Sequence, residues 1–227
     1  MNVNLLPRSA PPADHHAVEA AAFVLALRAR GVRNTAVLGA MERARRELFA
    51  PRRFSDLART DVALPLPCGQ TMTAPSVVAA MLVALGAESG GRALEIGTGS
   101  GWVTAALAKL GWRVHTVERY ATLAESAAAR FAVAGVAGAV TLVVADGLAP
   151  DAVEGRFDRI LVNGAMPAVP EWLTARLAPG GRLVGALAFE RWPRLVRIDR
   201  LADGGLRQEL GSTLRLSRLA AGPAASL

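Results

Sequence analysis

The stretch that most constrains the fold is a short apolar run that breaks into alternating glycines and continues as a helical pattern. Residues 92–102 are Arg-Ala-Leu-Glu-Ile-Gly-Thr-Gly-Ser-Gly-Trp, and apolar residues then recur at helical spacing. This order predicts a strand, a tight turn and a helix N-terminus, where unpaired backbone N–H groups and the helix dipole face a ligand. Trp102 stands where a third glycine of the dinucleotide fingerprint would fall, which argues against NAD.

Two further apolar runs end at acidic residues, the first at Glu118 and the second just before Asp146. Glu118 lies about as far downstream as the carboxylate that binds ribose in nucleotide-binding α/β folds. Because the carboxyl ends of parallel strands meet at one edge of a sheet, these acids and Glu95 are expected together at a ligand-binding edge.

The pattern Glu95-x-Gly-x-Gly-x-Gly, with Glu118 and Asp146 downstream, resembles the class I S-adenosylmethionine-dependent methyltransferases. Residues 157–163 resemble their fourth strand, and residues 177–183 resemble the turn into their fifth. The resemblance implies an α/β fold with a doubly wound, mostly parallel Rossmann-like sheet and helices on both faces. It also implies S-adenosyl-L-methionine as the cofactor. The residues expected to bind it are Glu95, Gly97, Thr98, Gly99, Ser100, Gly101, Glu118, Arg119, Asp146 and Gly147.

The chain is expected to divide into four parts: a flexible tail (1–13), a helical substrate or lid region (14–90), the cofactor-binding domain (91–219) and a C-terminal tail (220–227). Helices are predicted over residues 14–30, 35–48 and 75–85 from caps, apolar spacing and the positions of glycine and proline. Residues 195–199 and 210–216 flank the turn signal Ala-Asp-Gly-Gly, which predicts an antiparallel hairpin on the sheet edge.

Composition excludes several classes of protein. No stretch reaches the roughly 18 uninterrupted apolar residues of a membrane helix, and the single cysteine excludes an internal disulfide. The sequence has no cluster of Cys and His that would indicate a metal site. A cytoplasmic location is expected. The net charge of +7 comes with interspersed acids and only 5% aromatic residues, so nucleic-acid binding is not favoured.

The region before the glycine turn carries a second, narrower resemblance. Residues 46–51 are Arg-Glu-Leu-Phe-Ala-Pro, residues 61–66 are Asp-Val-Ala-Leu-Pro-Leu, and residues 69–75 are Gly-Gln-Thr-Met-Thr-Ala-Pro. With the glycine turn followed by Trp102, these segments resemble the protein-L-isoaspartate O-methyltransferase family. The resemblance implies methyl transfer to the α-carboxylate of an isoaspartyl residue in a damaged protein. The ester then closes to a succinimide, which can reopen as normal aspartate.

The implied chemistry fits the residues present. A carboxylate has a pKa of about 4, so no general base is needed to make the nucleophile. The hydroxyls of Thr71 and Thr73 can donate to that carboxylate, which makes them the catalytic candidates. The alternative is that both cap the helix beginning near Pro75. Gln70 and Asn163 are the other candidates for binding the substrate.

Two alternative functions remain open on the sequence alone. Family members usually carry Gly-His where this chain has Pro67-Cys68, and their last strand differs from residues 214–219. The first alternative is a methyltransferase that acts on another carboxylate or a small nucleophile, because fold and cofactor do not fix the substrate. The second is a module that binds the cofactor without catalysis and works through a partner surface.

Overall fold

The fold is built on a seven-stranded sheet with the strand order β5-β4-β3-β6-β7-β8-β9, beside a separate pair, β1-β2. The structure is a computed structural model that describes residues 15–86, 90–222 and 224, so the tail expected over residues 1–13 lies outside the described residues. Its helices and strands, in chain order, are α1 (His15–Ala29), α2 (Thr35–Arg43), η1 (Arg46–Leu48), η2 (Arg52–Leu57), β1 (Leu64–Pro65), η3 (Pro67–Gly69), β2 (Thr71–Met72), α3 (Pro75–Leu85), β3 (Arg92–Ile96), α4 (Trp102–Lys109), β4 (Arg113–Glu118), α5 (Ala121–Val133), η4 (Ala137–Ala139), β5 (Val140–Val144), β6 (Phe157–Met166), α6 (Glu171–Ala175), β7 (Leu177–Leu187), β8 (Arg194–Arg200) and β9 (Leu206–Thr213).

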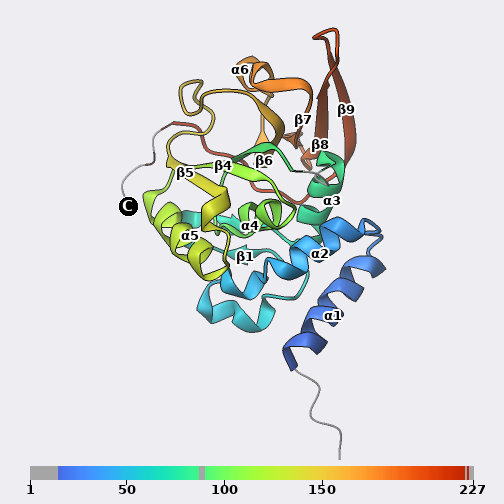
Figure 1. Cartoon of the computed structure of the whole chain (residues 1–227), viewed down its shortest axis with the longest axis vertical. Helices are drawn as coiled ribbons and strands as arrows, with labels where there is room; N and C mark the ends of the chain where they lie inside the picture. The colour runs from blue at the N-terminus through green and yellow to red at the C-terminus, as the bar shows by residue number, and fades with distance from the viewer. Residues whose placement is uncertain (1–14, 87–89, 223, 225–227) are drawn as a thin grey trace, which may run out of the picture.

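Strands β5, β4, β3, β6 and β7 pair in parallel, and β8 and β9 then pair antiparallel at one edge. Parallel strands need crossover connections, which place helices over the faces of the sheet. Figure 1 shows α4 and α5 near β3, β4 and β5, the strands that these two helices connect. The predicted doubly wound, mostly parallel α/β sheet with an antiparallel C-terminal pair is confirmed.

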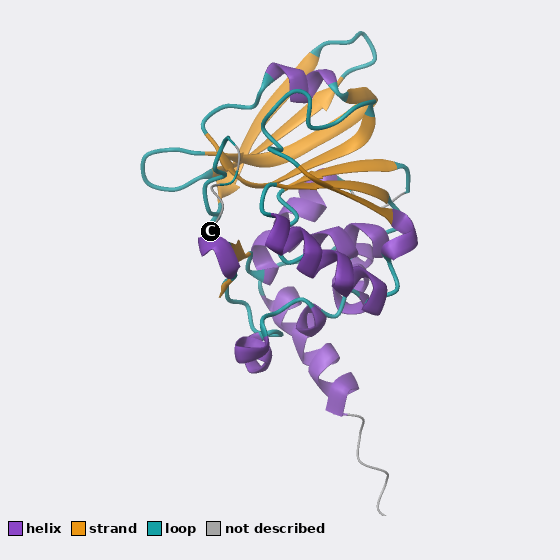
Figure 2. Cartoon of the chain, turned by 90° about the vertical axis from the view of Figure 1, so that its left-hand side faces the viewer, coloured by secondary structure: helices purple, strands orange, loops and turns teal. Residues whose placement is uncertain are grey.

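The two faces of the sheet are covered unequally. Helices α3, α4 and α5 pack on one face, and α1 and α2 pack on α3 or α4. Figure 2 shows this helical layer below the sheet, with one short helix above it; that helix is α6, which contacts β7. Successive residues of β3 alternate between the two cores, since Ala93 belongs to the helical side and Leu94 to the other.

The helix predicted over residues 35–48 is shorter than expected, and that prediction was wrong at its C-terminal end. Helix α2 ends at Arg43, and a separate 3-10 turn covers Arg46–Leu48. Arg45, between them, adopts a left-handed backbone with φ 42. A non-glycine residue in that region ends an α-helix, and the apolar spacing of the sequence does not reveal it.

The second strand of the predicted hairpin was also misplaced. Strand β9 covers Leu206–Thr213 rather than residues 210–216. The turn is tight, because the backbone N–H of Leu201 donates to the carbonyl of Gly205 over 2.8 Å. The carboxylate of Asp203 accepts the N–H of Gly205, also over 2.8 Å. The strand therefore begins directly after the turn and ends at Thr213, and the chain then forms a single bridge from Arg218 to Ala165 of β6.

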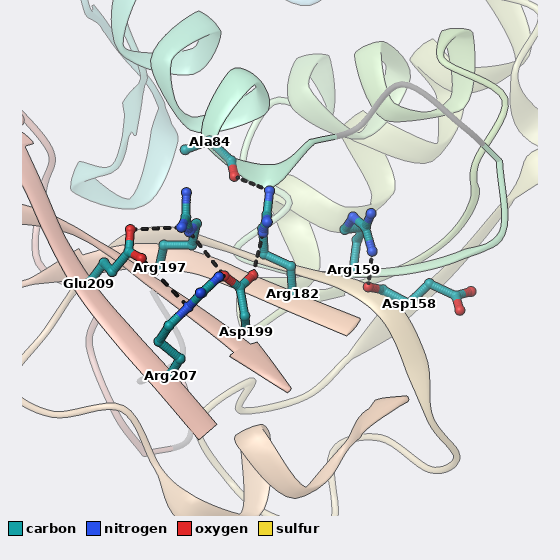
Figure 3. Close-up of polar contacts among 8 residues, drawn as sticks. All are labelled: Ala84, Asp158, Arg159, Arg182, Arg197, Asp199, Arg207 and Glu209. Carbon is teal, nitrogen blue, oxygen red and sulfur yellow. Dashed lines mark hydrogen bonds and ion pairs between the residues drawn. The ribbon is translucent and has the colours of Figure 1, made fainter. Parts of the chain in front are cut away.

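A row of charged side chains holds the hairpin to the helical layer (Figure 3). The strand register places Arg182 opposite Asp199, and Asp199 opposite Arg207. The Asp199 carboxylate lies 2.5 Å from Nε of Arg182 and 3.2 Å from Nη2 of Arg207. Nη1 of Arg182 also donates to the carbonyl of Ala84 near the C-terminus of α3, over 3.2 Å. A cation at that position interacts favourably with the helix dipole, so Arg182 joins α3 to the sheet.

Candidate active site

The glycine turn joins β3 to α4 at the carboxyl edge of the sheet. Gly97, Gly99 and Gly101 have φ values of 90, 54 and 88, in the left-handed region that side chains disfavour. The backbone N–H groups of Gly97 and Thr98 donate to the carbonyl of Val117, over 2.9 and 3.3 Å. These bonds fix the turn against the neighbouring strand β4.

A cleft opens above the glycine turn, at the carboxyl ends of β3, β4, β5 and β6. It encloses about 590 Å³ of empty volume, counting the part open to solvent. The predicted site residues that line it are Gln70, Thr71, Gly97, Gly99, Glu118, Arg119, Asp146, Gly147 and Asn163. Its further lining residues are Ile96, Val117, Tyr120, Leu148, Leu219 and Ala220.

Glu118 connects the glycine turn to the start of α5. Its carboxylate accepts the backbone N–H of Gly99 over 2.8 Å and that of Tyr120 over 3.0 Å. The residue is only 5% exposed, yet it lines the cleft. A carboxylate offers about four lone-pair sites, so Glu118 can still accept hydrogen bonds from the hydroxyls of a ligand.

Asp146 marks the other end of the cleft. One carboxylate oxygen accepts the backbone N–H of Leu148 over 3.0 Å. The other accepts the N–H of Gly222 over 2.6 Å, from a part of the chain 76 residues away. Asp146 therefore fixes both the loop after β5 and the end of the described chain.

Residues 217–222, here termed the C-terminal segment, pass along the rim of the cleft. The N–H of Ala165 donates to the carbonyl of Ser217, and the N–H of Leu219 donates to the carbonyl of Ala165, both over 2.8 Å. Leu219 packs on Gly164, where a Cβ atom would come within 2.4 Å of its Cγ atom. The sequence analysis missed Leu219 and Ala220 as lining residues, and Gly164 is the one local signal of this close approach.

Glu95 lies beneath the glycine turn rather than on the wall of the cleft. It is fully buried, and one carboxylate oxygen accepts hydrogen bonds from the hydroxyls of Thr104 and Thr116, the latter over 2.9 Å. Its Oε1 atom has no hydrogen-bond partner in the part of the chain that is described. Burial raises the pKa of Glu95 to about 8, against the opposing effect of the two threonine hydroxyls.

A second, smaller cavity of about 230 Å³ lies on the other side of the glycine turn. The predicted site residues on its wall are Thr71, Thr73, Thr98, Gly99, Ser100 and Asn163. The Thr73 hydroxyl donates to Oδ1 of Asn163 over 3.2 Å, and the amide of Asn163 donates to the carbonyl of Gly97 over 3.3 Å. These bonds join Thr73 to the glycine turn through Asn163.

Gly101 lines neither cavity. It begins α4 against α5, where a Cβ atom would approach Cε1 of Phe131 to 2.7 Å. Gly101 therefore allows two helices to pack closely, which is one of the roles that glycine takes in such turns.

Arg46 is a buried residue of this region that sequence reasoning missed. It is only 2% exposed. Nη1 donates to the carbonyls of Ala58 and Thr60, over 2.8 and 3.4 Å, and Nη2 donates to those of Val62 and Thr73, over 2.9 and 3.2 Å. Burial lowers the pKa of Arg46 to about 10. The guanidinium therefore links the segment after η2 to Thr73, which directly follows β2.

Comparison with known proteins places this arrangement in a family. Residues 18–216 match the family model described as protein-L-isoaspartate(D-aspartate) O-methyltransferase, PCMT. The chain belongs to this family. It is 45% identical over 210 residues to the protein-L-isoaspartate O-methyltransferase of Xanthobacter autotrophicus, covering 92% of this chain and 95% of the relative. It is 42% identical over 201 residues to that of Nitrobacter winogradskyi, covering 88% and 92%.

The fold of the family member agrees with a solved structure. A Plasmodium falciparum protein assigned as a protein-L-isoaspartate O-methyltransferase, in complex with S-adenosyl-L-homocysteine, superposes with a TM-score of 0.76. The match covers 88% of this chain and 97% of the other at 20% identity, so it bears on the fold alone.

The cleft of this PCMT family member fits the family's cofactor. Acidic side chains at Glu118 and Asp146 offer acceptors at two points of its wall, and apolar side chains such as Ile96 and Leu148 lie near them. Within the described ranges, no group of three or more His, Cys, Asp or Glu could hold a metal ion. No helix among the described residues is long and apolar enough to span a membrane.

Proposed function

We infer that this chain transfers a methyl group from S-adenosylmethionine to the α-carboxylate of L-isoaspartyl residues in damaged proteins. The observation that carries this function is that the cleft and the smaller cavity share Thr71, Gly99 and Asn163 on their walls. A ligand in the cleft and an acceptor in the cavity would therefore lie next to each other, in contact with the same three residues. When bound, S-adenosylmethionine supplies a methyl group on a positively charged sulfur, which an ionised carboxylate can attack.

The residues on the cleft are proposed to hold the cofactor. Glu118 would accept hydrogen bonds from ribose hydroxyls, with Arg119, Asp146 and Gly147 on the same wall. Gly97 and Gly99 would allow the ligand to approach the backbone. Thr98, Ser100 and Gly101 would help to hold the shape of the turn. Glu95 would support the turn from beneath, through the hydrogen bonds that it accepts from the hydroxyls of Thr104 and Thr116.

Thr71 and Thr73 are proposed to hold the acceptor. The Thr73 hydroxyl has a side-chain acceptor in Asn163, and it can turn to donate to a substrate carboxylate. Gln70, whose side chain donates to the carbonyl of Cys68, would bound the entrance with Thr71. The acceptor carboxylate is already ionised near neutral pH, so these groups would act by orienting it toward the methyl group. Such orientation can supply much of the rate enhancement of a transfer reaction.

The region 14–90 is proposed as the substrate side and 91–219 as the cofactor side, with the C-terminal segment added to the latter. The proposed substrates are isoaspartyl-containing proteins and peptides, and the proposed location is the cytoplasm. Neither nucleic acid nor a membrane is proposed as a partner.

The deciding experiment is methyl transfer from labelled S-adenosylmethionine to an isoaspartyl peptide, with the aspartyl peptide of the same sequence as the matched substrate. We expect label on the isoaspartyl peptide alone, and its release by mild alkali, because the product is an ester. The Gly99→Val variant serves as the inactive control, since a β-branched side chain is strained at the left-handed backbone of this cleft-lining residue.

Other outcomes would lead to other functions. Cofactor binding without transfer to either peptide would indicate a different carboxylate or a small nucleophile as the acceptor. Transfer to both peptides equally would show that the smaller cavity does not select the isoaspartyl linkage.

A further inference from the structure

A second groove lies at the end of the sheet opposite the cleft, where β3, β4 and β5 begin. It encloses about 610 Å³, counting the part open to solvent, and shares no lining residue with the cleft. Its polar lining side chains are Arg92, Arg113, His115 and Thr141. None of these residues has a role in the proposed methyl transfer.

The strand register brings these side chains to one face. Arg92 of β3 stands opposite Arg113 of β4, and His115 of β4 stands opposite Thr141 of β5. Arg113 and His115 are two residues apart, so they point to the same side of the sheet. Two arginines directly opposite each other on neighbouring strands repel, unless an anion lies between them.

No carboxylate lines the groove among the described residues, and within the same ranges neither Arg92 nor Arg113 is in an ion pair. The guanidinium of Arg92 lies 4.9 Å from the centre of the Phe157 ring. The nearby carboxylate of Asp158 accepts the backbone N–H of Arg92 over 2.9 Å. The lining of the groove is therefore cationic, and the carboxylate of Asp158 beside it accepts a backbone N–H rather than a guanidinium.

His115 adds an unused polar atom. Its Nε2 atom is buried and has no hydrogen-bond partner in the described part of the chain. The imidazole lies 6.1 Å from the Phe157 ring, centre to centre. Burial, followed by the charge of Arg92, lowers the pKa of His115, as expected for an imidazole beside cations with no anion present.

The groove is accessible because the connection from β5 to β6 contains no helix. Every residue of β5 is at least partly exposed. On this face the short helix α6 contacts β7 (Figure 2), and the β5–β6 connection covers part of the sheet through the buried Val153. A small solute can therefore reach the exposed Arg113 directly, and His115 lies beside it, partly exposed, with its Nε2 atom buried.

We propose that this groove binds a small anion that carries phosphoryl groups, between Arg92 and Arg113 and with His115 as a third donor. Guanidinium groups hold phosphate oxygens with paired N–H donors. From Arg92 to Thr141 the groove spans two strand spacings, about 10 Å, which suits one or two phosphoryl groups. That length is too short to follow a nucleic-acid backbone over several phosphates.

Pyrophosphate is the probe that tests the site. Calorimetry at low salt is expected to show one bound pyrophosphate per chain. In NMR spectra of the imidazoles, the His115 signals shift on titration, and the pKa of His115 rises. Saturation with S-adenosylhomocysteine leaves pyrophosphate affinity unchanged, because the two sites share no lining residue.

Single arginine substitutions separate a built site from general charge attraction. Arg113→Gln removes an exposed side chain of the groove, and we expect it to weaken pyrophosphate binding at least fivefold. Arg52→Gln is the matched control, because Arg52 is also exposed and begins η2, away from the groove. The control is expected to change affinity less than twofold, and both variants retain methyl transfer.

Four results would overturn the proposal. Equal weakening by Arg52→Gln would show attraction by net charge alone. Displacement of pyrophosphate by S-adenosylhomocysteine would place the anion in the cleft. Unchanged His115 signals at saturating pyrophosphate would exclude the groove. Tighter binding of a short DNA duplex than of pyrophosphate would indicate a nucleic-acid surface instead.

Discussion

The guanidinium of Arg46 lies over the ring of Trp102, with its central carbon 5.1 Å from the ring centre. Trp102 begins α4 directly after the glycine turn, while Arg46 also donates to the carbonyl of Thr73. One buried cation therefore contacts both the cofactor side and the substrate side of the proposed active site.

Replacing Arg46 by Met is expected to destabilise the fold by about 3 kcal/mol or more, because buried carbonyls lose their donors. Urea unfolding measures the change, with Arg52→Met as the exposed control. A loss no larger than that of the control would show that the carbonyls find other donors.

Glu118→Ala is expected to weaken S-adenosylmethionine binding by about 1.5–3 kcal/mol, the contribution of charge-assisted hydrogen bonds to ribose. Calorimetry measures the affinity, and the exposed Glu125→Ala is the control with the same change of charge. Unchanged binding would mean that Glu118 serves only the N–H groups of Gly99 and Tyr120.

Thr73→Val keeps the shape of the side chain and removes the hydroxyl that donates to Asn163. We expect a lower turnover with the isoaspartyl peptide, by about tenfold, and a cofactor affinity within twofold of the original. Thr213→Val, at the exposed end of β9, is the control. Equal loss of turnover and cofactor affinity would assign Thr73 a structural role.

Glu95→Gln is expected to change how stability depends on pH. Between pH 4.5 and about 8, the folded chain holds a proton on Glu95 that the unfolded chain has released. Stability therefore falls as pH rises through this window, by up to about 1.4 kcal/mol per unit. Glutamine does not titrate, so the stability of the variant relative to the original should increase from pH 5.5 to 7.5 in urea unfolding. A difference that is constant with pH would show that Glu95 ionises normally.

Gly99→Ala and Gly101→Ala are expected to fail in different ways. At Gly99 a Cβ atom meets only Leu66, at 3.6 Å, whereas at Gly101 it would come within 2.7 Å of Phe131. The first variant should lose cofactor affinity more than stability, and the second should lose stability first. Calorimetry measures the cofactor affinity of both variants, and thermal unfolding measures their stability. If the same variant were the more impaired in both assays, the two glycines would not have these separate roles.

The parts of the site that were predictable are those set by local sequence. The glycine turn and the acids at Glu118 and Asp146 follow apolar runs whose ends are visible in the chain, and parallel pairing then brings them to one edge. Helix α3 also has the predicted bounds, since Pro75 and Gly86 mark its two ends.

The parts that escaped prediction depend on contacts between distant residues. Arg46 is one of several arginines in a short stretch, and only tertiary packing determines that it, rather than Arg45, is buried. The bond from Gly222 to Asp146 joins residues 76 positions apart, and neither residue carries a local sign of the other. The start of β9 depends on how tightly the turn at Asp203 closes.

The C-terminal segment has a practical consequence for handling the protein. Gly222 is held to Asp146 at the cleft, so a purification tag or fusion partner joined to the chain after it would start only a few residues from the active site. Such an extension would hinder ligands from entering and leaving the cleft. An assay of the tagged enzyme would then measure slow ligand exchange caused by the tag. Helix α1, near the other end of the described chain, lies on the far side of the helical layer from the sheet (Figures 1 and 2).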